Sequence, residues 1–187
     1  SDDFLVRQLY YPFRTWSERV DKDVKSIFLV YSNGIFHLYE YQFAKPMEYS
    51  SLILVKQKNY TVEEDMTITT EEINQLLDAT QRVKEPKIAF PQANSLDRVI
   101  NLCELLQEHP MTREEITINY DFDARQTNYY TDAARYLGLV DKQRTDDITF
   151  SLTSKGRSIL RLSYKQRQLA FCEAILSHKV FSDSLKL

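Results

Sequence analysis

Side chains that can hydrogen-bond to nucleic-acid bases are concentrated in a short segment of this chain. They are Arg125, Gln126, Thr127, Asn128 and Tyr130. An arginine can donate two hydrogen bonds to a guanine, and a glutamine or an asparagine can bind an adenine in the same bidentate way. Such residues read base edges when they stand on the first turns of a helix that enters the major groove. They can act together only if the surrounding sequence forms that helix.

The sequence predicts a helix over Asp123–Leu137. Asp123 suits the N-cap of this helix, and Gly138 suits the left-handed position that ends it. The apolar residues recur at helical spacing and form one stripe, made of Tyr129, Ala133, Tyr136 and Leu137. Arg125, Gln126, Asn128 and Arg135 are left for the other faces. We therefore expect these polar side chains to face solvent or a partner.

A hairpin and a second helix are predicted after Gly138. Leu139 and Val140 are followed by a polar turn over residues 141–147 and by an alternating apolar run over residues 148–152. Thr153 is a candidate N-cap for a helix over Thr153–Leu162, and a further helix is expected over Lys165–His178 before a frayed tail. Helix, two-stranded wing and helix in this order describe a winged helix.

The residues before this segment complete a helix-turn-helix pattern. Asn94 or Ser95 can cap a helix that runs to about Glu108, and Pro110 stops it. Thr112 and Glu115 have the spacing of a capping box, which starts a short second helix. A short helix, a turn and a longer helix form the helix-turn-helix core.

The stretch RQTNYYTDAARYLGLVDK, continued by ITFSLTSKG, resembles the winged-helix modules in the DNA-recognition parts of type II restriction endonucleases. In these modules a polar helix that bears aromatic residues ends in a leucine-glycine turn, and a hairpin and a Leu-Thr-x-x-Gly helix start follow. The resemblance covers residues 95–178, and the same pattern occurs in other winged-helix proteins, including transcription regulators. It implies double-stranded DNA as a partner, but it does not by itself imply cleavage.

Basic residues are unevenly distributed, although the net charge is −3. Residues 140–167 hold seven basic side chains against three acidic ones, so the local charge is positive over the wing and the helix after it. Lys142, Arg144, Lys155 and Arg157 are the candidates for phosphate contacts, which position a protein on DNA without reading sequence. A solvated basic surface without a partner is the alternative interpretation.

The N-terminal part predicts an antiparallel sheet with flanking helices. Strands are expected over residues 26–31, 35–43 and 51–56, with an Asn33-Gly34 turn between the first two. Both faces of the second strand carry apolar residues, so we expect a sheet covered on both sides. Pro12 predicts an extended or turn conformation before a short helix near residues 15–20, and acids after Thr70 predict a capped helix.

These patterns together predict an α+β protein of two domains. The segment from Gln81 to Pro91 contains two prolines and three basic residues and is interpreted as a linker. The boundary is placed there, with an α+β domain over residues 1–85 and a winged-helix domain over residues 86–187. The N-terminal sheet is expected to add contacts to DNA or to form a homodimer.

The resemblance to restriction endonucleases raises the alternative of a metal-dependent nuclease site in this chain. Such sites hold Mg²⁺ with two or three carboxylates beside a lysine. The nearest arrangement combines Glu18, Glu40 and Lys56, but Gln42 stands where the lysine is needed, and Glu40 paired with Lys56 across the strands is the simpler interpretation. We therefore expect no catalytic site in this chain and no cofactor, unless Mg²⁺ binds to a small nuclease that uses these residues.

Composition excludes several classes of protein. No run approaches the 18 or so apolar residues of a membrane span, and SDDFLVRQ lacks the pattern of a signal peptide, so we expect no membrane and a cytoplasmic location. Cys103 and Cys172 lie in apolar helical patterns and are interpreted as buried thiols. The three histidines have no metal-ligand spacing.

Four functions follow as hypotheses. The first is a DNA-binding module, the target-recognition part of a restriction-type endonuclease. The second is a winged-helix transcription regulator with a ligand pocket lined by Tyr39 and Tyr41. The third is a scaffold that binds a protein, and the fourth is a small Mg²⁺-dependent nuclease. Fold alone does not separate them, because winged helices serve several functions.

Overall fold

The computed structural model describes residues 2–62, 67–120, 124–144 and 147–185. The chain has an α+β fold, with two small antiparallel sheets in its described part. It divides into two compact units, Ser1–Val62 and Glu63–Leu187. The division therefore lies before the helix Thr70–Ala79, whereas the sequence placed a boundary at residues 85 and 86. Among the described residues, no helix combines the length and apolar character that a membrane crossing needs.

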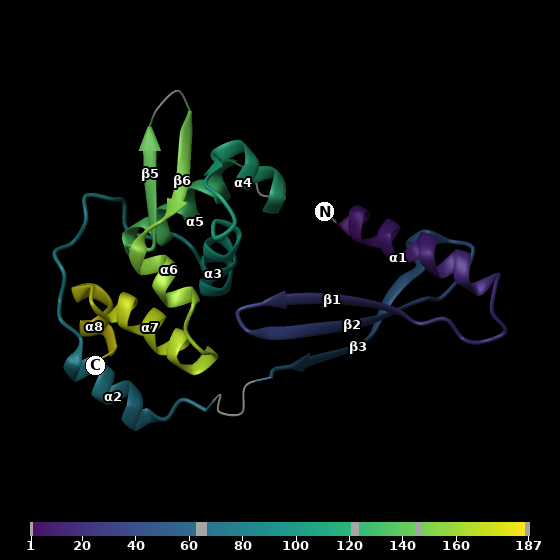
Figure 1. The fold of residues 1–187 in the computed structure, drawn as a ribbon, viewed down its shortest axis with the longest axis horizontal. Helices are drawn as coiled ribbons and strands as arrows, with labels where there is room; N and C mark the ends of the chain where they lie inside the picture. The colour runs from purple at the N-terminus through teal and green to yellow at the C-terminus, as the bar shows by residue number, and fades with distance from the viewer. Residues whose placement is uncertain (1, 63–66, 121–123, 145–146, 186–187) are drawn as a thin grey trace. The chain divides into compact units, whose positions relative to one another are not determined.

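In its described residues, the first unit is a three-stranded meander with one α-helix and one short 3₁₀ helix. Its strands pair antiparallel in the order β1-β2-β3, as expected. The elements of this unit are α1 (Asp2–Ser17), β1 (Ser26–Ser32), β2 (Ile35–Phe43), the 3₁₀ helix η1 (Tyr49–Ser51) and β3 (Leu52–Tyr60) (Figure 1). Asn33 and Gly34 both have positive φ, 50° and 79°, as a two-residue hairpin turn of the Asn-Gly type requires.

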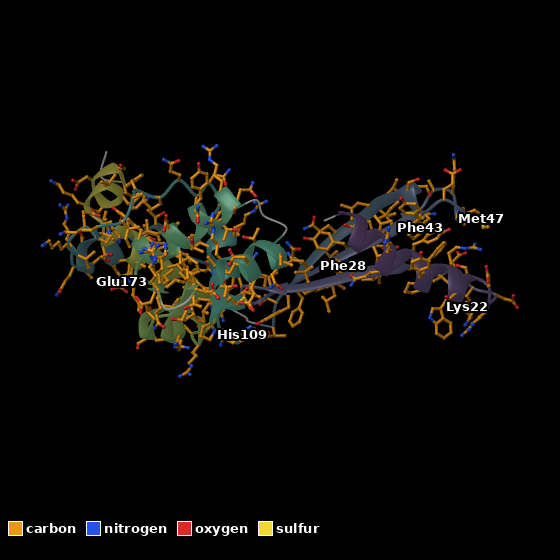
Figure 2. All side chains as sticks on the ribbon, turned by 90° about the horizontal axis from the view of Figure 1, so that it is seen from above. Lys22, Phe28, Phe43, Met47, His109 and Glu173 are labelled. Atoms are coloured by element: carbon orange, nitrogen blue, oxygen red, sulfur yellow. The ribbon has the colours of Figure 1, made fainter. Side chains whose placement is uncertain are left out.

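Helix α1 corrects the prediction of an extended segment around Pro12. The helix continues through Pro12, although a proline inside a helix lacks the N–H that would bond back to the preceding turn. Packing explains this outcome, because Tyr10 and Phe13 place their rings 5.1 Å and 5.0 Å from the ring of Phe43. Phe43, at the end of β2, is 2% exposed (Figure 2). Burial of these rings outweighs the cost of the proline.

The prediction of a sheet covered on both faces was wrong. Ile27, Leu29 and Tyr31 alternate along β1 and are 54%, 55% and 58% exposed. On β3 the residues from Ile53 to Tyr60 are exposed. The described residues of this unit thus leave one apolar sheet face open to solvent.

The second unit contains the helices and the hairpin around the candidate residues. Its sheet has the order β4-β6-β5, and every pairing is antiparallel. Figure 1 shows the β5–β6 hairpin projecting beyond the helices of this unit. The elements are α2 (Thr70–Ala79), α3 (Leu96–Leu105), β4 (Met111–Thr112), α4 (Arg113–Tyr120), α5 (Ala124–Tyr136), β5 (Val140–Arg144), β6 (Ile148–Leu152), α6 (Ser154–Leu160), α7 (Tyr164–Leu176) and α8 (Lys179–Leu185).

The core of the second unit lies between α3, α4, α5, α6, α7 and the base of the hairpin. Its largest fully buried apolar side chains come from different elements and are Ile100, Leu102, Leu106, Ile116, Leu139 and Phe171. Burial raises the pKa of the Cys103 thiol to about 12, so this cysteine stays protonated, as a buried structural thiol should.

Several helix ends follow their sequence signals. Ser95 accepts a hydrogen bond from the backbone N–H of Arg98, and Thr153 accepts one from Gly156. Thr112 and Glu115 form the expected capping box, because each bonds the backbone N–H of the other. The cap of α2 is Thr69, one residue before the predicted Thr70.

Gly138 has a φ of 71° and closes α5. Its N–H donates to the carbonyl of Arg135, and the Leu139 N–H donates to the carbonyl of Ala134. This pair of bonds is a Schellman motif, which satisfies two carbonyls at the end of the helix. The predicted N-cap of α5, Asp123, lies outside the described residues.

The segment interpreted as a linker packs against the second unit. The Val83 N–H donates to the carbonyl of Ser177, and Phe90 stacks on Phe181 with 5.6 Å between ring centroids. Helix α2 is tied to α7 through Lys165 and Glu72, whose charged atoms are 2.9 Å apart. Long-range contacts therefore fix residues that looked like a linker in the sequence.

Two further elements were missed by the sequence patterns. The short strand β4 pairs with β6 through Met111 and Phe150, which adds a third strand to the hairpin. The expected frayed tail contains α8, whose Phe181 packs against the core. Each depends on a partner distant in the sequence, and local periodicity does not report such partners.

Candidate nucleic-acid interface

The first turns of α5 present polar side chains to solvent. Arg125, Gln126 and Asn128 are exposed, whereas the later residues of the helix are mostly buried against α3 and α4. The Arg125 guanidinium lies over the ring of Tyr129, 5.3 Å from its centroid, and its Nε donates a hydrogen bond to the Tyr129 hydroxyl. Stacking on this half-buried ring restricts the arginine near the start of the helix.

Thr127 and Tyr130 point into the unit, which corrects their placement among the base-reading residues. The Thr127 hydroxyl lies 2.9 Å from that of Thr117 on α4, and Thr127 is fully buried. Tyr130 is 4% exposed, and its hydroxyl donates to the side-chain carbonyl of Asn94 at 2.8 Å. Both hydroxyl groups are therefore engaged by partners within the unit.

The apolar stripe of α5 is rotated relative to the prediction. Threonines contribute to the buried face, because Thr131 donates its hydroxyl to the backbone carbonyl of Thr127 at 2.8 Å. A threonine that bonds to the preceding turn hides its polar group and can be buried. Tyr129, predicted inside, is only half-buried. The exposed face of the helix is therefore narrower than the sequence suggested.

Arg135 lies in the last turn of α5 and is half-buried. Its guanidinium pairs with Asp132 at 2.6 Å, three residues earlier. A cation in the last turn also suits the negative end of the helix dipole. These contacts give Arg135 a local structural role, nearly three turns away from the exposed polar side chains of Arg125 and Gln126.

A polar pocket of about 620 Å³ adjoins the exposed turns of α5. Gln126, Tyr129 and Tyr130 line it from α5, and Asn94, Ser95 and Arg98 line it from the start of α3. The Arg98 guanidinium lies 5.7 Å from the centroid of the Tyr130 ring. Sequence reasoning missed the α3 residues, because only the packing of α3 against α5 brings them beside the helix start.

The hairpin carries exposed basic residues along β5. Lys142 and Arg144 are both exposed, and the Lys142 ammonium lies 5.8 Å from the centroid of the Phe150 ring on β6. The prediction had placed Lys142 to Arg144 in a turn, but β5 extends to Arg144 and pairs with β6 throughout. The strand pairing holds these two cations along a regular edge.

Lys155 and Arg157 lie at the start of α6 and bind backbone carbonyls. The Lys155 ammonium donates to the carbonyl of Leu137 at 3.2 Å, and Arg157 donates to the carbonyl of Leu152 at 2.8 Å. Burial by neighbouring atoms lowers the pKa of Lys155, although the residue as a whole remains exposed. Both side chains thus join α6 to the turns before it while keeping surface area for other contacts.

The residues considered for a nuclease site do not gather into one. Glu40 bonds Lys25 at 2.9 Å and faces Lys56 across the strand pair, whereas Glu18 pairs with Arg14 at 2.6 Å. The hydrogen bond from Lys25 holds the pKa of Glu40 below its usual value. Within the described ranges, no three carboxylate, histidine or cysteine side chains come together as metal ligands would.

The two tyrosines considered for a ligand pocket stack on one another. The ring centroids of Tyr39 and Tyr41 are 6.4 Å apart. Tyr41 lines a pocket of about 620 Å³ between α1 and the sheet, together with Phe13 and Phe43. Tyr41 alone of the two contributes to this pocket.

Comparison with known families gives a separate match for each end of the chain. A domain of unknown function (DUF6997) matches residues 1–61, and another domain of unknown function (DUF7226) matches residues 98–187. The first match ends beside the division at Val62 and Glu63. Neither a curated protein nor a solved structure matches the chain.

Proposed function

We propose that the second unit is a winged-helix module that reads duplex DNA, with α5 as the recognition helix. The order α3, β4, α4, α5, β5, β6 and α6 supports this, because it places a helix pair before a hairpin and a short strand beside that hairpin. A helix-turn-helix of this kind inserts the N-terminal turns of its second helix into the major groove. The β5–β6 hairpin is then the wing.

The observation that carries the proposal is the exposure of α5. Its first turns expose Arg125, Gln126 and Asn128, while packing buries most of the rest of the helix. These three side chains are the types that form bidentate contacts with guanine and adenine. Such a helix can present its exposed N-terminal turns to a DNA groove while its buried C-terminal part stays packed in the fold.

The wing supplies contacts of a different kind. Lys142 and Arg144 stand exposed along β5 and are placed to meet phosphates, which fixes the module on the duplex without selecting a sequence. Lys155 and Arg157 add positive charge at the start of α6. With a net charge of −3 for the chain, binding depends on this local field, which acts over about 8–10 Å at physiological salt.

Within this proposal the chain recognises DNA and does not cut it. The resemblance of residues 95–178 to recognition modules of type II restriction endonucleases supports a role in target selection. Glu18 and Glu40 each form an ion pair with a different basic residue, and this argues against a shared metal site and against cleavage by these two residues. We therefore assign cleavage to another part of a restriction-type enzyme.

Selection from a pool of randomised duplexes tests the proposal. The chain is incubated with the pool and Mg²⁺ at two salt concentrations, and the bound fraction is sequenced and inspected for cut ends. A short enriched motif, lost in Gln126→Ala and kept in the control Gln166→Ala, an exposed glutamine on α7, supports base reading by α5. No retention at low salt, where phosphate contacts are strongest, overturns DNA binding. Cut product would instead return the nuclease hypothesis.

A further inference from the structure

The open face of the N-terminal sheet carries an ordered row of aromatic side chains. Strand pairing sets Tyr31 opposite Phe36 and Phe36 opposite Tyr60, so the three rings cross β1, β2 and β3 in one line. Residues that are directly opposite in an antiparallel pair project from the same face. The Tyr31 and Phe36 centroids are 4.7 Å apart. The three side chains therefore form an aromatic strip across the sheet, in which the Tyr31 and Phe36 rings are in contact.

This strip is accessible within its unit. Tyr31 is 58% exposed, Tyr60 is 50% exposed, and Phe36 between them is half-buried. Helix α1 covers the sheet elsewhere, where it packs on Phe43. The exposed parts of these rings are therefore available to a ligand that has flat faces of its own.

Lysines flank the strip on the same face. The next row of the pairing joins Leu29, Leu38 and Lys58, and the row after it ends in Lys56. The Lys58 ammonium lies 5.9 Å from the centroid of the Tyr60 ring. A shallow pocket of about 200 Å³ lies here, lined by both lysines and by Tyr60. Aromatic and cationic groups thus meet at one place.

The acid on this face is neutralised. Glu40 stands between Ile27 and Lys56 in the pairing and forms an ion pair with Lys25 at 2.9 Å. The face therefore keeps an excess of positive charge from its lysines. Glu63, Glu64 and Asp65 follow β3 in the sequence but lie outside the described residues, so this balance is that of the sheet face alone.

We propose that this face binds unpaired nucleotides of a single-stranded nucleic acid. Bases would stack on Tyr31, Phe36 and Tyr60, because every base has a flat face that an aromatic ring can cover. Lys56 and Lys58 would lie beside the phosphates that connect those bases. Charge complementarity favours this ligand over an apolar protein, which would have to bury the charged ends of Lys56 and Lys58 and offer them no phosphate. The proposal is independent of duplex reading by α5.

Fluorescence anisotropy with the full chain tests this inference. The probe is a dye-labelled 20-nucleotide oligo-dT at 50 mM salt, because thymine strands do not pair with themselves. Tyr31→Ala and Tyr60→Ala are each expected to weaken binding about tenfold. Tyr49→Ala is the matched control, since Tyr49 is also 50% exposed but lies in η1, beside Tyr10 of α1.

Charge is tested separately, so that the result does not depend on the tyrosine variants folding. Lys56→Gln and Lys58→Gln are each expected to reduce the slope of log affinity against log salt by about 0.7. The control is Lys22→Gln, because Lys22 is exposed at the other end of the same unit (Figure 2). The fluorescence of Trp16 in α1 reports whether each variant folds.

Three outcomes would overturn the inference. One is the absence of oligo-dT binding at 50 mM salt. Another is oligo-dT binding that is lost in Arg125→Ala and kept in both tyrosine variants, because the oligonucleotide then binds to the second unit. The third is a dimer in sedimentation that dissociates on Tyr31→Ala, because a second copy then covers the face. The selection from randomised duplexes is a separate experiment, and its result decides whether α5 reads duplex DNA.

Discussion

Glu85 joins the segment between α2 and α3 to two buried side chains of the second unit. Its carboxylate accepts hydrogen bonds from the Tyr136 hydroxyl and from the Lys179 N–H at 3.1 Å, and lies 3.0 Å from Nδ1 of His178. Tyr136 is 5% exposed and His178 is 3% exposed, and their rings lie 4.3 Å apart. Removal of this carboxylate by Glu85→Ala should therefore destabilise the second unit.

The magnitude follows from the groups left without an acceptor. A buried donor that loses its partner costs about 1–3 kcal/mol, and Glu85 serves two such side chains. The Glu85 side chain is itself 41% exposed, so water can enter and replace part of what is lost. We expect a loss of about 2 kcal/mol for Glu85→Ala and about 1 kcal/mol for Glu85→Gln, which keeps one acceptor.

Urea unfolding followed by circular dichroism at 222 nm measures this loss. Lys84→Ala is the control, because Lys84 is the exposed neighbour in the same segment and should change the free energy of unfolding by less than about 0.5 kcal/mol. Trp16 fluorescence reports the first unit and should not change in either variant. If Glu85→Ala is as stable as Lys84→Ala, the hydrogen bonds of Glu85 do not stabilise the second unit.

The same contacts predict a pH dependence. The hydrogen bond from Tyr136, helped by those from His178 and Lys179, lowers the pKa of Glu85 below its usual 4.5. The folded state thus favours the carboxylate, and this stabilisation is complete above pH 4.5 and lost as the pH falls through the lowered pKa. The stability difference between the native chain and Glu85→Gln should shrink over that range. A difference that is constant from pH 6 to pH 3 would contradict this.

Further predictions concern the turn after α5 and the wing. Gly156→Ala should cost about 3 kcal/mol in urea unfolding, since its Cβ would lie 2.4 Å from the Leu139 carbonyl oxygen. The Cβ added by Gly138→Ala would meet no atom, but the residue must keep a φ of 71°, so we expect the free energy of unfolding to fall by only about 1 kcal/mol. Equal losses in the two variants would refute the close packing of α6 on Leu139. In duplex binding, Lys142→Gln and Arg144→Gln should each reduce the salt slope by about 0.9, and unchanged slopes would remove the wing from the interface.

Local signals predicted much of the secondary structure. The Asn33-Gly34 turn, the Ser95 and Thr153 caps and the glycine that ends α5 were read correctly, because each depends on a few adjacent residues. Pro12 misled the prediction, since its local cost was offset by contacts with Phe43, which is distant in sequence. Propensity is a weak guide wherever tertiary packing opposes it.

The candidate site was predicted only in part. Exposure of Arg125, Gln126 and Asn128 followed from their polarity, but Thr127 was included among the base-reading residues because it stands on the first turns of the helix. A buried partner, Thr117, satisfies that hydroxyl, and no local pattern reveals such a partner. The aromatic row of the sheet could likewise not be predicted from the sequence, because it depends on the register in which the three strands pair.

The most direct test of base reading by α5 is a comparison of single base-pair changes in the selected duplex. Affinities are measured for each change with the native chain, Arg125→Ala and the control Gln166→Ala. We predict that Arg125→Ala removes discrimination of about 1–3 kcal/mol at one base pair and leaves the other positions unchanged. A uniform loss at every position would mean that Arg125 contacts only phosphate, and no loss would place the recognition surface away from α5.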